Sequence, residues 1–206
     1  MMVFKEFEIK LAADGRIKEV KEQLHKLGFS QSKDVIQFDY YYDDGKKLYE
    51  KDELLRIRFE YTPSNELIYC QWTWKGPRPT KRTDLREDHS IDISVDQAED
   101  LRTILEKLGF KVLVAFRKVR TRYERSLDEI EIEFDKEVVL LHEGKKIPMG
   151  SFLQVSLESE LPEDLNVKEL EKKLWGNYAM RLGFSEKDRI DTTYVEIALE
   201  LLKREN

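Results

Sequence analysis

The chain has 206 residues, of which 40% are hydrophobic and 38% charged, and its formal net charge is -6. This length favours one domain over residues 1–206, and the acidic balance argues against a general nucleic-acid binder, which would carry a basic surplus to neutralise phosphates. No run approaches the roughly 18 apolar residues of a membrane helix, and the first ten residues interleave charge instead of forming a signal-peptide core. We therefore expect a cytoplasmic protein, monomeric or homodimeric, that binds neither nucleic acid nor membrane.

A strand and a helix are predicted within the first 28 residues. Residues 3–11 alternate between two faces, as in a strand with one polar side. The charged residues on that polar face are Glu6, Glu8 and Lys10. Asp14 then fits the N-cap of a helix over residues 14–27, and Gly28 fits its end.

The middle of the chain is predicted to consist of strands separated by turns, followed by a second helix. The strands, recognised by their β-branched and aromatic content, are expected at residues 35–42, 54–61, 67–75 and 86–94. The second helix covers residues 95–108 and ends at Gly109. Both helices close with the tripeptide Leu-Gly-Phe, which hints at two related halves.

The last part of the chain is predicted to be mixed. Strands are expected at residues 111–124, 129–134 and 152–158, with residues 145–151 as a connection. Helical spacing then covers residues 165–175 and 192–202, on either side of a short turn at 178–182. The fold class is therefore α+β with a strongly antiparallel sheet.

The charges on the predicted strands recur at every second residue, and acids and bases are sorted onto different strands. If the sheet curls into a barrel, these faces line a polar lumen in which the charges pair with one another or with a ligand. The basic residues on such faces are Lys10, Arg56, Arg58, Lys75, Lys118, Arg120 and Arg122, joined by Arg86 from the short strand. Lysines and arginines in this number suit a polyphosphate better than a single carboxylate.

The acidic residues on the same faces would repel a phosphate directly. They are Glu6, Glu8, Glu131, Glu133 and Asp135. An oxygen-ligated Mg²⁺ or Mn²⁺ would mediate, since these ions take a few carboxylates and complete their coordination with water and phosphate oxygens. The alternative is that the charges form solvated outer faces of half-exposed strands, and Glu60 and Glu124 fit strand-end solvation equally well.

Other kinds of site find little support in the sequence. Cys70 is the single cysteine, so an internal disulfide or a cysteine-based metal cluster is excluded. The three histidines, His25, His89 and His142, lack the spacing of zinc ligands. The chain also lacks a Gly-rich phosphate loop, a dinucleotide fingerprint and a nucleophile elbow.

Several blocks of sequence resemble the CYTH superfamily, the triphosphate tunnel metalloenzymes. They are Glu6-Phe7-Glu8-Ile9-Lys10, Gln37-Phe38-Asp39-Tyr40-Tyr41, Leu55-Arg56-Ile57-Arg58, Trp74-Lys75-Gly76-Pro77, Lys118-Val119-Arg120-Thr121-Arg122-Tyr123 and Thr193-Tyr194. The resemblance implies an eight-stranded antiparallel β-barrel with helices packed outside, a divalent metal held by acidic residues, and a triphosphate lying along lysines and arginines. Members of the superfamily include class IV adenylyl cyclases, thiamine triphosphatases and inorganic tripolyphosphatases.

The resemblance also implies roles for individual residues. Glu6, Glu8 and Lys10 would be catalytic, and the basic residues of the lumen, including Arg86, would hold phosphates. Glu6, Glu8 and Asp135, which match the family pattern, would hold the metal. We add Glu133 and Glu158 as further ligands, because they are acidic residues on the same strand faces. One departure matters: where the family's last tunnel strand reads G-x-F-x-E-x-E, this chain has Gln154 and Ser156 in place of both carboxylates.

That departure leaves three functions open. The first is metal-dependent hydrolysis of a triphosphate such as tripolyphosphate, thiamine triphosphate or a nucleoside triphosphate, and we rank it first. The second is a class IV adenylyl cyclase that makes cAMP from ATP. The third is a non-catalytic module that binds triphosphate or polyphosphate, because the missing carboxylates at Gln154 and Ser156 put turnover in doubt.

Overall fold

The computed structural model describes residues 5–80, 85–125, 129–159 and 166–205. Its strands are β1 (Lys5–Ala12), β2 (Ser30–Asp43), β3 (Leu54–Tyr61), β4 (Leu67–Lys75), β5 (Arg86–Ile93), β6 (Lys111–Glu124), β7 (Ile130–His142), β8 (Lys145–Ser159) and β9 (Arg189–Ile190). Its α-helices are α1 (Ile17–Lys26), α2 (Lys47–Glu50), α3 (Val95–Lys107), α4 (Val167–Leu174) and α5 (Tyr194–Glu205). None of the helices in these ranges has the length and apolar content needed to cross a bilayer.

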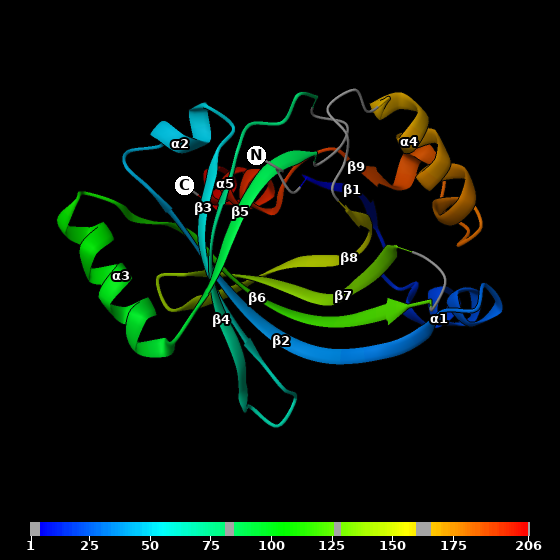
Figure 1. Cartoon of the computed structure of the whole chain (residues 1–206), viewed down its shortest axis with the longest axis horizontal. Coiled ribbons are helices and arrows are strands. Elements are labelled where there is room, and N and C mark those ends of the chain that lie inside the picture. Colours follow the sequence, from blue (N-terminus) through cyan, green and yellow to red (C-terminus); the bar gives the residue numbers. More distant parts are fainter. Residues whose placement is uncertain (1–4, 81–84, 126–128, 160–165, 206) are drawn as a thin grey trace.

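All the strand pairings are antiparallel and form one curved sheet. The strands follow the order β5-β4-β3-β2-β6-β7-β8-β1-β9, and β5 also pairs with β1 over Lys5↔Glu87 and Glu6↔Arg86. This short pairing brings the two edges of the eight main strands together around a central space, while the helices lie on the outside (Figure 1). The predicted α+β fold with eight antiparallel strands and outer helices is confirmed.

The strand neighbours follow a two-fold pattern. Exchanging β1 to β4 with β5 to β8 leaves every pairing among these eight strands unchanged, including the central β2–β6 pair. In each half the first strand leads into a helix, α1 or α3, which ends two residues before a glycine with positive φ, Gly28 at 83° or Gly109 at 94°. Only glycine adopts this conformation at no steric cost, so the repeated Leu-Gly-Phe marks equivalent points of the two halves.

Three apolar clusters attach the helices to the outer wall. The first packs α1 and α4 against β1, β7 and β8, around Phe7 and Leu24. The second packs α5 against Phe116 and Phe152, and the third packs α3 against β3 and β4, around Ile57. Because the apolar faces are used outside, the charged faces of the strands are left to line the interior.

Several predicted boundaries were wrong. Residues 145–151 are not a connection but the first half of β8, paired with β7 along Leu141↔Lys146 and Leu140↔Ile147. Asp14 does not cap α1: its carboxylate accepts a hydrogen bond from the Ser151 amide at 2.6 Å, and the helix begins at Ile17. The turn expected at 178–182 begins later, at residue 180, because Tyr178 and Ala179 belong to a π-helical turn, Trp175–Ala179.

Candidate functional site

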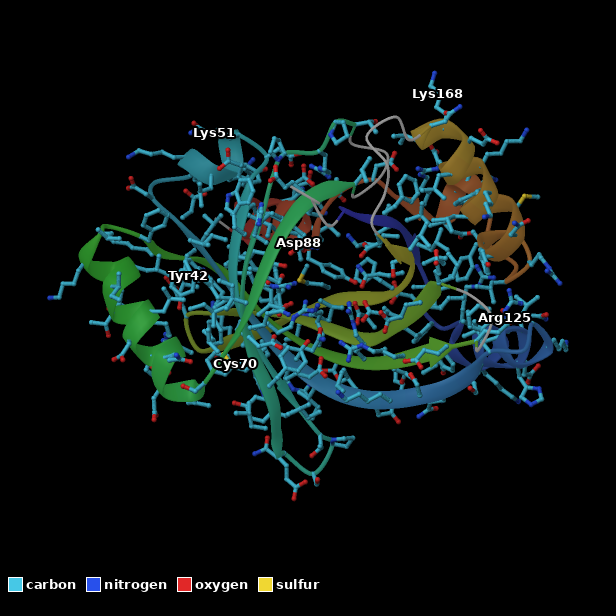
Figure 2. The ribbon with its side chains drawn as sticks, in the orientation of Figure 1. Tyr42, Lys51, Cys70, Asp88, Arg125 and Lys168 are labelled. Atoms are coloured by element: carbon cyan, nitrogen blue, oxygen red, sulfur yellow. The ribbon has the colours of Figure 1, made fainter. Side chains whose placement is uncertain are left out.

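The inward strand faces enclose a cavity of about 750 Å³. Figure 2 shows side chains projecting from opposite walls into this space, with Asp88 of β5 on one side. The charged residues that line it are Glu8, Lys10, Lys33, Arg56, Arg58, Lys75, Asp88, Lys118, Arg120, Arg122, Glu124, Glu131 and Glu133. Period-two charge on these strands therefore faces a lumen, and the alternative of solvated outer faces is wrong for them.

One cluster of charged side chains joins the neighbouring strands β2, β3 and β6 in the wall of the cavity. Asp39 is fully buried and accepts two hydrogen bonds from Arg58, at 2.6 and 2.9 Å. Lys118 lies 2.9 Å from the same carboxylate, so two cations share one anion. Burial would raise the pKa of Asp39, but Arg58 and Lys118 hold it well below its usual range.

This arrangement leaves Lys118 only partly compensated. Its side chain is 1% exposed, and Arg120 and Arg58 both lie close to it. Burial and these two arginines outweigh the attraction of Asp39 and lower the pKa of Lys118 to about 7. The tunnel thus contains a lysine that titrates near neutral pH.

A second cluster is built around Arg120 of β6. Its guanidinium forms a bidentate pair with Asp135, at 2.6 and 2.8 Å, and also donates to Glu133 and to Gln154. Tyr194 of α5 donates its hydroxyl to the same Asp135 at 2.6 Å. Burial acts to raise the pKa of Asp135, but Arg120 and Tyr194 bring it to about 2.

A third cluster of charged side chains links β6 to β3 and β7. Arg122 donates to both oxygens of Glu60, at 3.1 and 2.8 Å, and also lies 3.1 Å from Glu133 and 3.3 Å from Glu131. Glu60 is fully buried and also accepts from Lys33. Burial would raise the pKa of Glu60, yet Arg122 lowers it to about 2, so this residue is not a solvated strand end.

Arg56 of β3 differs from the other arginines of the cavity. It is 9% exposed and makes one hydrogen bond, to the Thr73 hydroxyl at 3.3 Å. Its Nε has no hydrogen-bond partner, and it forms no ion pair within the described part of the chain. Arg56 lines the cavity, and its guanidinium has donors that the described part of the chain leaves unused.

Two lysines complete the cationic lining. Lys10 of β1 donates to the Thr192 carbonyl at 3.3 Å, lies 3.9 Å from Glu8 and stands 4.5 Å above the Tyr194 ring. Lys75 of β4 pairs with Asp88 at 3.2 Å. All the predicted phosphate-binding residues except Arg86 therefore meet in one cavity.

Arg86 does not line the cavity. Its buried guanidinium donates to the carbonyls of Asp52 and Gly76 and lies 3.2 Å from the Asp52 carboxylate. Arg78 pairs with the same Asp52 and with Glu196 of α5, at 2.8 and 3.0 Å. Arg86 thus belongs to a network that ties the β4–β5 loop to the N-terminus of α5.

The predicted metal ligands are only partly brought together. Glu8 and Glu133 line the cavity, whereas Asp135 is fully buried in the wall behind Arg120. The side chains of Glu6 and Glu158 lie outside the described part, although their backbones pair across β1 and β8. Among the described residues, no three acidic or other ligating side chains are gathered as they are in a preformed metal centre.

The donor chemistry nevertheless fits a hard cation shared with a ligand. Backbone register places Ser156 between Glu8 on β1 and Glu131 on β7, and Glu6 lies opposite Glu158 two residues further along. These carboxylate oxygens are the ligands that Mg²⁺ and Mn²⁺ prefer, and phosphate oxygens would complete the set. Asp135 is less suited, because its oxygens are already bound by Arg120 and Tyr194.

Tyr194 offers a test of how α5 is joined to the wall. We expect Tyr194→Phe to lower the free energy of unfolding by about 1–3 kcal/mol, since Asp135 would lose one of its buried hydrogen bonds. Urea denaturation measures the difference. Tyr49→Phe is the control, because the Tyr49 hydroxyl makes no hydrogen bond to any residue that the structure describes. Equal effects of the two changes would contradict this assignment.

Comparisons with known proteins agree with this geometry. A family model described as the CYTH domain matches residues 5–194. A candidate adenylate cyclase of Methanocaldococcus jannaschii is 36% identical over 153 residues, covering 69% of this chain and 82% of that protein. A structure from Pyrococcus horikoshii OT3 has a TM-score of 0.71 and 26% identity, covering 95% of this chain and 99% of the other.

A further solved structure shares the fold at lower identity. It is a candidate adenylyl cyclase from Hippeastrum, described as having a dominant triphosphatase activity, with a TM-score of 0.61, 18% identity and 95% coverage of both chains. The match of the family model to nearly the whole chain agrees with the eight-stranded tunnel and its charged lining. This chain belongs to the CYTH domain family.

Proposed function

We propose that this chain hydrolyses a phosphoanhydride bond of an organic or inorganic triphosphate held inside the tunnel. The observation that carries the proposal is the convergence of eight cationic side chains on one cavity of about 750 Å³. They are Lys10, Lys33, Arg56, Arg58, Lys75, Lys118, Arg120 and Arg122. A triphosphate carries several charged groups along a line, which matches cations contributed by successive strands.

The reaction would be an in-line displacement at phosphorus. A water oxygen bonds to the terminal phosphorus, the bond to the bridging oxygen breaks, and phosphate, diphosphate and a proton are released. Arg56 has unused donors for the phosphoryl oxygens, and Lys10 adds charge at the α5 end of the cavity. Mg²⁺ or Mn²⁺, held by Glu8 with Glu6, Glu131 and Glu158, would supply Lewis-acid polarisation of phosphoryl oxygens.

Product analysis tests this proposal. We expect phosphate release from at least one of tripolyphosphate, thiamine triphosphate and ATP in the presence of Mg²⁺ or Mn²⁺. We expect Arg56→Met to lower kcat/KM by roughly 30- to 1,000-fold, corresponding to about 2–4 kcal/mol of lost charge-assisted hydrogen bonding. Arg117→Met, on the outer face of the same barrel, is the matched control and should retain activity.

Two other outcomes would replace hydrolysis. Formation of cAMP and diphosphate from ATP would indicate a cyclase, the activity named for the relative from Methanocaldococcus jannaschii. In that reaction the ribose 3′-hydroxyl takes the place of water. Tight binding of a triphosphate without turnover would indicate a receptor, a possibility favoured by the absence of carboxylates at Gln154 and Ser156.

A further inference from the structure

Gln154 of β8 stands at the junction between the acidic and basic walls of the tunnel. Its side chain lines the cavity and is 5% exposed. The amide Nε2 donates to Glu8 on β1 at 2.6 Å, and the amide oxygen accepts from Arg120 on β6. One neutral side chain therefore bridges an anion on one strand and a cation on another.

The carboxylates around Gln154 are already compensated by cations of the protein. Glu133 accepts from both Arg120 and Arg122, and Asp135 is paired bidentately with Arg120. Glu8 has the Gln154 amide on one oxygen, and Lys10 lies 3.9 Å from the same oxygen. Without a ligand, the described carboxylates around Gln154 therefore have little uncompensated negative charge to attract a divalent cation.

A carboxylate at position 154 would add negative charge that the neighbouring cations do not compensate. Its oxygen would face the Glu8 oxygen at the hydrogen-bond distance now spanned by the amide. Two carboxylates so close cannot both stay ionised unless a cation lies between them. The amide instead donates to Glu8, so it holds that carboxylate in place without creating a cation site.

A bound triphosphate would also change how the carboxylates around Gln154 are compensated, by competing for their arginine partners. Its oxygens would draw on the donors of Arg120 and Arg122 that now satisfy Glu133. The carboxylates would then lose their counterions while phosphate oxygens appear beside them, so a divalent cation would gain both charge and ligands.

We propose that Gln154 is a positioning residue that makes metal binding depend on the triphosphate. The tunnel binds a triphosphate without metal, and it holds Mg²⁺ or Mn²⁺ only when phosphate oxygens join Glu8 and Glu131. This inference rests on the proposed function, because it takes a triphosphate as the ligand of the cavity.

Titration with Mn²⁺ alone, followed by the electron paramagnetic resonance signal of the free ion, tests the role of Gln154. We expect no saturable binding to the wild type below millimolar Mn²⁺, and at least tenfold tighter binding to Gln154→Glu. Ser32→Glu is the control, since Ser32 lines the same cavity on β2 and its hydroxyl donates to the Arg122 carbonyl and not to a carboxylate. It adds the same charge to the same cavity and should give no comparable gain.

A second variant keeps the test decisive if Gln154→Glu does not fold. Ser156→Glu places a carboxylate between Glu8 and Glu131 in the strand register, and it should also gain Mn²⁺ affinity. Tight Mn²⁺ binding by the wild type would overturn the inference. So would the absence of a gain in the folded variants, or an equal gain in Ser32→Glu.

Calorimetric titration of the wild type with tripolyphosphate in excess chelator separates this inference from the proposed function. Binding with chelator present supports the inference, and binding that requires added metal overturns it. If tripolyphosphate, thiamine triphosphate and ATP all fail to bind with or without metal, the proposed function fails. The Mn²⁺ comparison between wild type and Gln154→Glu still reports on Gln154 in that case.

Discussion

Replacing Arg120 with methionine is expected to lower the free energy of unfolding by about 3–5 kcal/mol, the cost of removing one partner from a buried ion pair. Arg120 is 3% exposed and compensates Asp135 and Glu133 together, so the variant leaves two carboxylates buried with too few donors. Methionine fills most of the volume of the lost side chain, which limits the contribution of a cavity. Urea denaturation monitored by circular dichroism measures the change.

The neighbouring Arg117 provides the control for this experiment. It lies three residues earlier on β6, faces outward and pairs with the exposed Glu137 at 3.3 Å. Arg117→Met should cost no more than about 1 kcal/mol, as expected for a surface pair. Similar losses for the two variants would show that Arg120 does not compensate the buried carboxylates.

The effect of Arg120→Met should also depend on pH in a defined direction. In the wild type, burial opposes ionisation of Asp135, but Arg120 keeps its pKa at about 2, below the unfolded value. That contribution is present above the unfolded pKa and is lost as pH falls through the folded pKa. The difference between wild type and variant should therefore be largest near neutral pH and shrink below about pH 4.

The fold could be predicted from the sequence wherever one periodicity was uninterrupted. The alternation in β1, β3 and β4 predicted those strands with bounds close to the observed ones. Residues 145–151 were missed because Gly150 and Pro148 read as a connection, whereas the register irregularities around Val138 let β8 continue through them. Asp14 was assigned as the N-cap of α1 because an aspartate just before a helix is typical of an N-cap. The sequence alone does not show whether its carboxylate accepts a hydrogen bond from the helix or from a distant strand.

The site could be predicted in its basic half but less well in its acidic half. Four strands, β1, β3, β4 and β6, place a lysine or arginine inward, so seven of the eight predicted phosphate-binding residues share one cavity. Asp39, Glu60 and Asp88 were not assigned roles, although each lies on the inward face of its strand and pairs with one of these cations. The alternation of residues along each strand identifies these three acidic residues as inward-facing. Which cations they pair with depends on the order of the strands in the sheet, which the sequence does not give.

Lys118 is expected to make triphosphate binding depend on pH. Burial, Arg120 and Arg58 lower its pKa to about 7, against the attraction of Asp39 and Asp135. A bound triphosphate adds negative charge next to this lysine and raises its pKa, so binding takes up a proton above pH 7. The logarithm of the affinity should approach a fall of one per pH unit above pH 7, roughly 50-fold between pH 7 and 9.

Calorimetric titration with tripolyphosphate in buffers of different ionisation enthalpy measures this proton uptake. Lys118→Gln should bind more weakly at pH 7, but its affinity should approach that of the wild type at pH 9, where the wild-type lysine is largely neutral. The ligand titrates equally in both experiments, so the difference between the two profiles belongs to Lys118. Parallel profiles would mean that Lys118 stays charged in the free tunnel, with Asp39 as a full counterion despite sharing it with Arg58.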